Sequence, residues 1–146
     1  MSGTALITGA SGGIGLELAR IHARNGNDLV LVARTKMKLD EIKSEFESKY
    51  HVRVIIVSMD LSVTDAAREV YDIVSNQNIQ VDYLINNAGY GDYGLFEETN
   101  WEKEARMIHL NITTLTQLTK LFLPGMISRR GGKIMNLGST ASFQPG

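Results

Sequence analysis

"TGASGGIG", residues 8–15, joins an apolar segment to an amphipathic one. Glycines in such a turn let the backbone come close to a ligand, and a helix that begins there offers free N–H groups and a positive dipole end to a pyrophosphate. The spacing Gly9-x3-Gly13-x-Gly15 differs from the G-x-G-x-x-G dinucleotide fingerprint, and the Gly-Lys-Ser/Thr of a phosphate-binding P-loop is missing. The turn favours a nucleotide site, with a strand–helix turn that binds nothing as the alternative.

Apolar runs and amphipathic segments alternate on both sides of this turn. Strands are expected at Thr4–Thr8, Asp28–Ala33, Val52–Val57, Val81–Ile85 and Lys133–Leu137, and helices at Ile14–Asn25, Lys36–Lys49, Thr64–Asn76 and from about Trp101 to Met126. In the first helix, Ile14, Leu18 and Ile21 have helical spacing. Near-continuous apolar strands joined by helices predict an α/β fold with a doubly wound parallel sheet, in a single domain.

The composition excludes several classes of protein. The net charge of −1, with no long basic run, argues against a nucleic-acid partner. The chain has no cysteine, so a thiol nucleophile is excluded, and its three histidines lie far apart, so no metal site is expected. No signal peptide and no spanning apolar run are recognisable, so we expect no membrane partner and a cytoplasmic location.

Four more features follow the later strands in order. Asp60-Leu61 comes just past the third strand, "NNAG" at Asn86–Gly89 follows the fourth, and Ser139 follows the fifth. Asn111 lies inside the long helical stretch, where its amide competes with backbone hydrogen bonds. This position predicts a local kink or a polar role, with an exposed polar residue as the alternative.

The ordered set of motifs resembles the short-chain dehydrogenase/reductase family, whose cofactor turn is T-G-x3-G-x-G and which has N-N-A-G after its fourth strand. The resemblance covers the whole chain. It implies a Rossmann-type sheet, a nicotinamide cofactor, and hydride transfer to or from the carbonyl or alcohol carbon of a small-molecule substrate. It also implies that the complete protein is a homo-oligomer.

The resemblance further implies a role for each motif residue. The cofactor would be bound by Gly9, Ser11, Gly13, Ile14 and Gly15 at its pyrophosphate, by Asp60 and Leu61 at its adenine, and by Asn86, Ala88 and Gly89 on the ribose side. Part of the "NNAG" role would be to brace the central strands. Asn111 would anchor a water in a proton relay, and Ser139 would donate a hydrogen bond to the substrate oxygen. For Asp60, a cap or turn residue remains the alternative.

The end of the second strand predicts which nicotinamide cofactor binds. Enzymes selective for NAD place an acidic residue there to bond the ribose hydroxyls. This chain has Ala33 followed by Arg34, and the planar guanidinium of arginine suits a 2′-phosphate. We therefore expect NADP(H) to be preferred over NAD(H), with a solvated surface arginine as the alternative for Arg34.

One family motif, Tyr-x-x-x-Lys, does not occur. The tyrosines at positions 50, 71, 83, 90 and 93 are each followed, four residues later, by a residue other than lysine. The resemblance implies that this tyrosine is the general acid/base and that the lysine lowers its pKa. We therefore expect residues 1–146 to be the N-terminal part of an enzyme, with five strands present, the C-terminal strands missing and no activity alone. The alternative is a non-catalytic dinucleotide-binding module or partner subunit.

Overall fold

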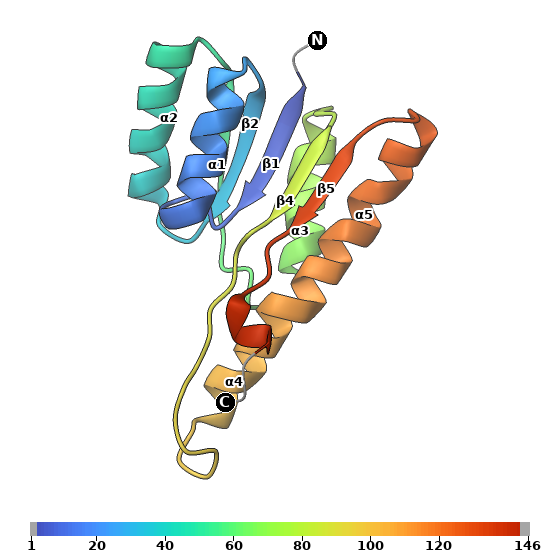
Figure 1. The fold of residues 1–146 in the computed structure, drawn as a ribbon. Coiled ribbons are helices and arrows are strands. Elements are labelled where there is room, and N and C mark those ends of the chain that lie inside the picture. The colour runs from blue at the N-terminus through green and yellow to red at the C-terminus, as the bar shows by residue number, and fades with distance from the viewer. Residues whose placement is uncertain (1–2, 144–146) are drawn as a thin grey trace.

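The computed structural model describes residues 3–143, which form one five-stranded parallel sheet (Figure 1). Its strand order is β3-β2-β1-β4-β5. The strands are β1 (Thr4–Thr8), β2 (Asp28–Ala33), β3 (Val54–Ser58), β4 (Tyr83–Asn86) and β5 (Lys133–Asn136). The order reverses direction at β1, so β1 and β4 lie side by side at the switch point where open α/β sheets bind ligands.

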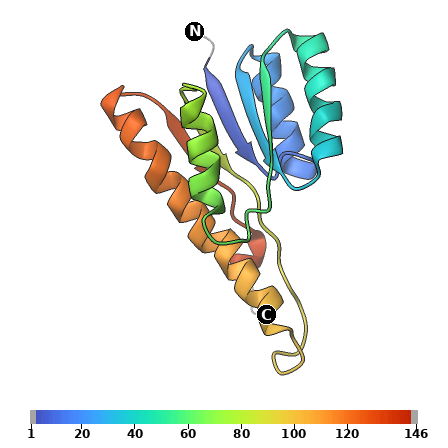
Figure 2. The ribbon, with the colours of Figure 1, turned by 180° about the vertical axis from the view of Figure 1, so that it is seen from behind.

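Helices cover both faces of the sheet. The helices α1 (Gly13–Arg24) and α2 (Lys36–Tyr50) lie on one face (Figure 1). On the other face, α3 (Ala66–Asn76) packs against α5 (Leu115–Ser128), as Figure 2 shows. The segment before α5 consists of α4 (Trp101–Ile108) and a π-helical turn, η1 (His109–Thr114). The predicted doubly wound α/β fold is confirmed.

The central strands separate two apolar clusters. Successive side chains of a strand point to opposite faces, so Leu6 packs towards α3 and α5 while Ile7 packs towards α1 and α2. Phe46 of α2 is fully buried in the first cluster, and Leu118 of α5 is almost fully buried in the second. No helix in residues 3–143 is both long and apolar enough to cross a membrane.

The buried face of α1 is made of small residues rather than of its isoleucines. Ile14 and Ile21 are 64% and 51% exposed, whereas Gly15, Ala19 and Ala23 are buried. A Cβ atom at Gly15 would overlap the carbonyl oxygen of Gly9. The small residues at four-residue spacing therefore let α1 lie very close to the end of β1, and this close approach decides which face is buried.

Several element boundaries also differ from those expected. The third strand begins at Val54 rather than Val52, because Val54 is the first residue in register with β2, opposite Leu29. The third helix begins at Ala66 rather than Thr64, because Asp65 has a left-handed backbone with φ of 67°. Such a residue cannot continue a right-handed helix.

The edge strand β5 leads to a testable prediction for the polypeptide of residues 1–146. Within the described residues β5 pairs only with β4, and Met135 on it is 46% exposed. An exposed apolar edge is a template for pairing between molecules, so light scattering should show concentration-dependent association. Met135→Lys should reduce association, because a charge on an edge strand opposes pairing.

Met37→Lys is the matched control for this experiment. Met37 is 75% exposed on α2, away from any strand edge, so its replacement should leave association unchanged. A stable monomer in the unaltered polypeptide at high concentration would contradict the prediction.

Candidate functional site

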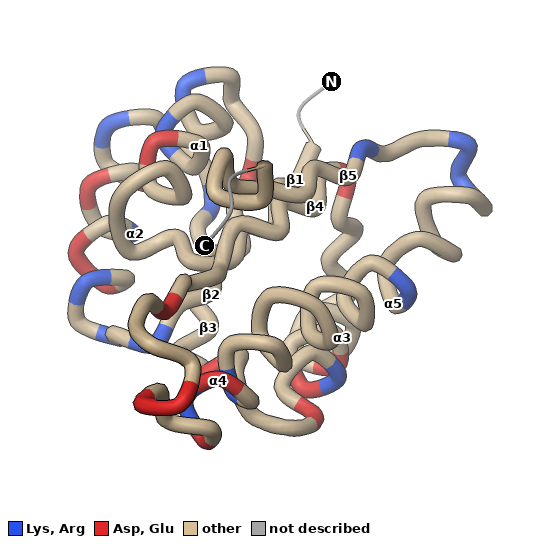
Figure 3. The backbone as a smooth tube through the Cα atoms, turned by 60° about the horizontal axis from the view of Figure 1, so that its bottom comes forward, with Lys and Arg blue, Asp and Glu red and all other residues tan. Residues whose placement is uncertain are grey.

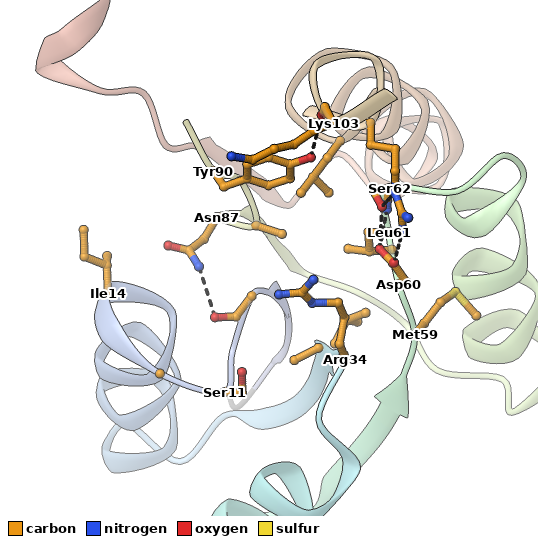
Figure 4. A pocket seen from close by; sticks show the side chains of 18 of the residues that line it. Ser11, Ile14, Arg34, Met59, Asp60, Leu61, Ser62, Asn87, Tyr90 and Lys103 are labelled. Atoms are coloured by element: carbon orange, nitrogen blue, oxygen red, sulfur yellow. Dashed lines mark hydrogen bonds and ion pairs between the residues drawn. The ribbon is translucent and has the colours of Figure 1, made fainter. Parts of the chain in front are cut away.

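A cavity of about 860 Å³ lies at the carboxyl ends of the strands (Figure 4). Its size falls in the range of small-molecule and cofactor pockets. Twenty residues line it: Gly9, Ser11, Gly12, Ile14, Val32, Ala33, Arg34, Met59, Asp60, Leu61, Ser62, Asn87, Ala88, Gly89, Tyr90, Asn100, Glu102, Lys103, Arg106 and Leu110. The pocket thus joins the glycine-rich turn to the segments that follow β2, β3 and β4.

The glycine-rich turn presents an open helix N-terminus. Gly12 at the N-cap of α1 provides no side-chain cap, and the first turn of α1 contains no acidic residue. A Cβ atom added at Gly12 or Gly13 would meet nothing within 4 Å, so the space beside them is free. The first N–H groups of α1 are consequently available to an anionic ligand, as pyrophosphate binding requires.

The "NNAG" segment braces the switch point between β1 and β4. Thr8 Oγ1 accepts hydrogen bonds from the backbone N–H groups of Asn87 (3.0 Å) and Ala88 (2.9 Å). The Asn87 amide donates to the carbonyl oxygens of Thr8 (2.9 Å) and Gly9 (3.3 Å). The glycine turn is therefore held against the end of β4 by side-chain bonds, in line with the expected structural role of this motif.

Asn86 lies beneath the pocket rather than in its wall. Its amide donates to Thr119 Oγ1 (3.1 Å) and to Asn136 Oδ1 (2.9 Å), which ties β4 to α5 and β5. A small second cavity borders Asn86 and Thr114, and Asn86 Oδ1 has no partner among the described protein groups.

Asp60 forms a turn and an ion pair at one end of the pocket. Its Oδ1 accepts from Ser62 N (2.9 Å) and Ser62 Oγ (2.7 Å), and its Oδ2 lies 2.6 Å from Arg106 Nη2. Burial raises the pKa of the Asp60 carboxyl, but the bonds from Ser62 and the charges of Arg106 and Arg34 outweigh burial and keep that pKa below its ordinary value. Asp60 thus remains ionised, and it acts as a turn residue as well as a wall of the pocket.

Arg34 enters the pocket from the end of β2. Figure 4 shows its side chain directed into the space between the glycine turn and Asp60. Ser58 Oγ donates to the Arg34 carbonyl oxygen (3.0 Å), which fixes the backbone at this point. Arg34 takes part in none of the ion pairs found among residues 3–143, so its charge remains available to an anion.

Asn111 lies in η1, where the long helix widens into π-helical geometry. Its Oδ1 accepts from Tyr90 N (3.3 Å), and its Nδ2 donates to Tyr90 O (2.8 Å). The expected kink or polar role is thus seen as a wide turn whose amide clamps the loop after β4. Isolated π-helical turns often mark functional positions.

The segment after β4 makes two further contacts with α4. The Tyr90 hydroxyl donates to the Lys103 carbonyl oxygen (2.9 Å), and Lys103 Nζ lies 2.6 Å from Asp92 Oδ1. Together with the bonds of Asn111, these bonds hold the start of the loop against α4 and η1. The Tyr90 and Lys103 side chains lie at the upper edge of the pocket in Figure 4.

Ser139 is exposed on the loop after β5. Its Oγ accepts from Ala141 N (3.1 Å) and so caps the short 3-10 turn η2 (Thr140–Phe143). It lies at the carboxyl end of a strand, as expected, but it does not line the large pocket.

The structure brings some of the predicted site residues together and leaves others outside the pocket. The residues that line it are Gly9, Ser11, Ile14, Arg34, Asp60, Leu61, Ala88 and Gly89. The residues that do not are Gly13, Gly15, Asn86, Asn111 and Ser139. The sequence analysis did not predict that Lys103 and Arg106 line the pocket. Arg106, Leu110 and Thr114 are spaced by four residues, which is a helical signal that they share one face.

No group of three or more His, Asp or Glu side chains in the described part of the chain could hold a metal ion.

The sequence and the fold were compared with those of known proteins. Residues 3–146 match the sequence profile of the short chain dehydrogenase family. The chain belongs to this family. It is 32% identical to human very-long-chain 3-oxoacyl-CoA reductase, over 97% of the chain and 46% of the human protein. It therefore spans about half the length of this curated relative.

Two solved structures of the family are also similar. A short-chain dehydrogenase from Sphingobium yanoikuyae, in complex with NADPH, superposes with a TM-score of 0.91 and 38% identity, over 98% of this chain and 56% of that one. The bulky-bulky ketone specific alcohol dehydrogenase from Comamonas testosteroni gives a TM-score of 0.91 at 36% identity, over 98% of this chain and 57% of that one. The short-chain dehydrogenase assignment thus rests on both sequence and fold.

Proposed function

We propose that the protein is an NADP(H)-dependent oxidoreductase that acts on the carbonyl or alcohol carbon of a small molecule. The observation that carries the proposal is the pocket itself, which joins an uncapped helix N-terminus to the free charge of Arg34. The first fits a pyrophosphate and the second fits a 2′-phosphate. Support also comes from the relatives, because one is a 3-oxoacyl-CoA reductase and another was solved with NADPH.

The proposed work is divided between residues that line the pocket and residues that lie outside it. Bound NADPH would supply the hydride. The N-terminus of α1 would hold the pyrophosphate, Arg34 the 2′-phosphate, and Asp60 with Leu61 the adenine. Ser139 would hydrogen-bond to the substrate oxygen and stabilise the charge that develops there, while Asn111 would hold a relay water. The proton donor would be a Tyr-x-x-x-Lys element, which this sequence does not contain.

Cofactor selectivity tests the proposal directly. Charge-assisted hydrogen bonds suggest that Arg34 makes NADPH bind more tightly than NADH by about 1.5–3 kcal/mol, or roughly tenfold to a hundredfold. Replacing Ala33 with Asp and Arg34 with Ser should reverse the order, because the new carboxylate accepts bonds from free ribose hydroxyls and repels the phosphate. Fluorescence titration with both cofactors measures the outcome.

Lys36→Ser provides the matched control for this titration. Lys36 is close to Arg34 in sequence but pairs with Asp40 at 2.7 Å, so its removal should change the selectivity far less. Equal affinity of the unaltered protein for the two cofactors would refute the role of Arg34.

We also propose that the complete protein self-associates through the long helix. Charged residues gather on α2 and around α4, whereas α5 carries only Lys120 (Figure 3). Exposed apolar side chains occur along the continuous helical stretch of α4, η1 and α5, at Trp101, Ile108, Ile112, Leu123 and Ile127. An apolar helix face of this kind supports packing against another protein surface.

A further inference from the structure

Two bonds set the orientation of the Arg106 side chain, which extends from α4 to the Asp60 end of the pocket. Its Nη2 lies 2.6 Å from Asp60 Oδ2, and its Nε donates to Ser62 Oγ at 3.1 Å. These contacts engage one edge of the planar guanidinium and span more than 40 residues of sequence. Within residues 3–143, Nη1 takes part in no hydrogen bond and no ion pair.

The pocket that Arg106 lines also has apolar lining residues. Leu110, four residues further along the same helix, also lines the pocket, as do the buried side chains of Val32 and Leu61. The Arg106 side chain is 54% exposed, so a large part of it remains accessible to a ligand. A flat, fixed cation beside apolar walls suits a planar aromatic ligand, because guanidinium groups stack on aromatic rings and present an unused edge of donors.

The position of Arg106 in the pocket indicates which part of a dinucleotide would reach it. The residue at the end of β2 contacts the adenosine ribose in doubly wound folds. Arg34 occupies that place, and its charge also acts on Asp60, so the two residues share one end of the pocket. The base attached to that ribose therefore falls between the ends of β2 and β3 and α4, where Arg106 lies.

We propose that Arg106 contacts the purine of the cofactor and that Asp60 and Ser62 hold its guanidinium plane in place for this contact. The inference rests on the proposed function and adds to it a base-binding residue from α4. The contact depends on the planar shape of the Arg106 guanidinium, which stacks on the purine, and not on its charge alone. A lysine at this position would keep the charge but lose both the plane and the two-point bond to Asp60 and Ser62.

The test uses two probes and two variants of the protein. Adenosine 2′,5′-bisphosphate carries the base, whereas inorganic pyrophosphate carries only charge, and both are titrated by calorimetry. Arg106→Lys and Arg106→Met should each weaken binding of adenosine 2′,5′-bisphosphate by about twofold to thirtyfold, the range of cation–π contacts. Arg106→Lys should leave pyrophosphate binding unchanged. Arg68→Met, on an exposed residue of α3 outside the pocket, should alter neither.

Several results would overturn the inference. The first is that Arg106→Met binds adenosine 2′,5′-bisphosphate as tightly as the unaltered protein does. The second is that Arg106→Lys does so. The third is that Arg106→Lys weakens the binding of the bisphosphate and of pyrophosphate by the same factor. Thermal melting shows whether a variant has lost its fold. If Arg106→Met does not fold, the affinities of Arg106→Lys, which can keep the bond to Asp60, are the test of the inference. If the unaltered protein binds neither NADPH nor the bisphosphate, the proposed function itself fails, and this outcome is distinct from a failure of Arg106 alone.

Discussion

The polypeptide of residues 1–146 is expected to bind NADPH but not to oxidise it with carbonyl substrates. The turn for the pyrophosphate and Arg34 are present, whereas no Tyr-x-x-x-Lys spacing occurs. Without a positioned acid the substrate alkoxide cannot be protonated in step with hydride transfer. General acid catalysis contributes about 10²–10⁴-fold, and poor positioning of the nicotinamide removes more. Absorbance of NADPH at saturating substrate measures the effect.

A longer polypeptide that carries a Tyr-x-x-x-Lys helix should restore turnover. In that protein, Ser139→Ala should lower the rate about a hundredfold to a thousandfold, as loss of an oxyanion donor does. Ser142→Ala is the matched control, since Ser142 is a neighbouring serine of η2 and should be replaceable with little loss.

Robust turnover by residues 1–146 would contradict this prediction and would point to another acid. Tyr90 and Tyr93, in the loop after β4, would then be the candidates for the general acid. The Tyr90 hydroxyl already donates to the Lys103 carbonyl oxygen, and Tyr93 is 94% exposed and does not line the pocket.

The second large effect is expected from Gly15→Ala. The added methyl group would overlap the carbonyl oxygen of Gly9, and that backbone is itself held by Asn87. The start of α1 must then move away from β1. Overpacking of this kind costs about 1–3 kcal/mol, which corresponds to a drop in Tm of roughly 3–12 °C for a chain of this size. The affinity for NADPH should fall as well, because the N–H groups of the first turn would move.

Gly12→Ala is the control that distinguishes this steric overlap from the effect of replacing any glycine of the turn with alanine. Gly12 has an extended backbone, with φ of 179°, and nothing lies within 4 Å of its Cβ position. Its Tm should therefore stay within about 2 °C of the unaltered protein, given that an alanine adopts this conformation without strain. A Gly15→Ala protein as stable as Gly12→Ala would show that α1 does not depend on this close approach. Calorimetry or circular dichroism gives both values.

Much of the candidate site could be placed from the sequence because each residue lies next to a recognisable strand end. Arg34 follows β2, Asp60 lies two residues after β3, and Gly89 lies three residues after β4. In a parallel sheet these ends meet at one edge, so local pattern alone places their residues in one pocket. The same reasoning placed Ser139 at that edge but not its bond to Ala141, which depends on the turn that follows.

The sequence by itself determined the alternation of strands and helices, the parallel sheet and the glycine turn. These features depend on the periodicity of apolar residues and on the spacing of glycines, which are local properties of the chain. Only the tertiary structure decided which face of α1 is buried, that Asn111 clamps Tyr90, and that Arg106 joins Asp60 across 46 residues. These contacts depend on how closely whole elements approach one another. The distance between two elements is determined by the packing of side chains that are remote in sequence, and the local periodicity of apolar residues does not encode that packing.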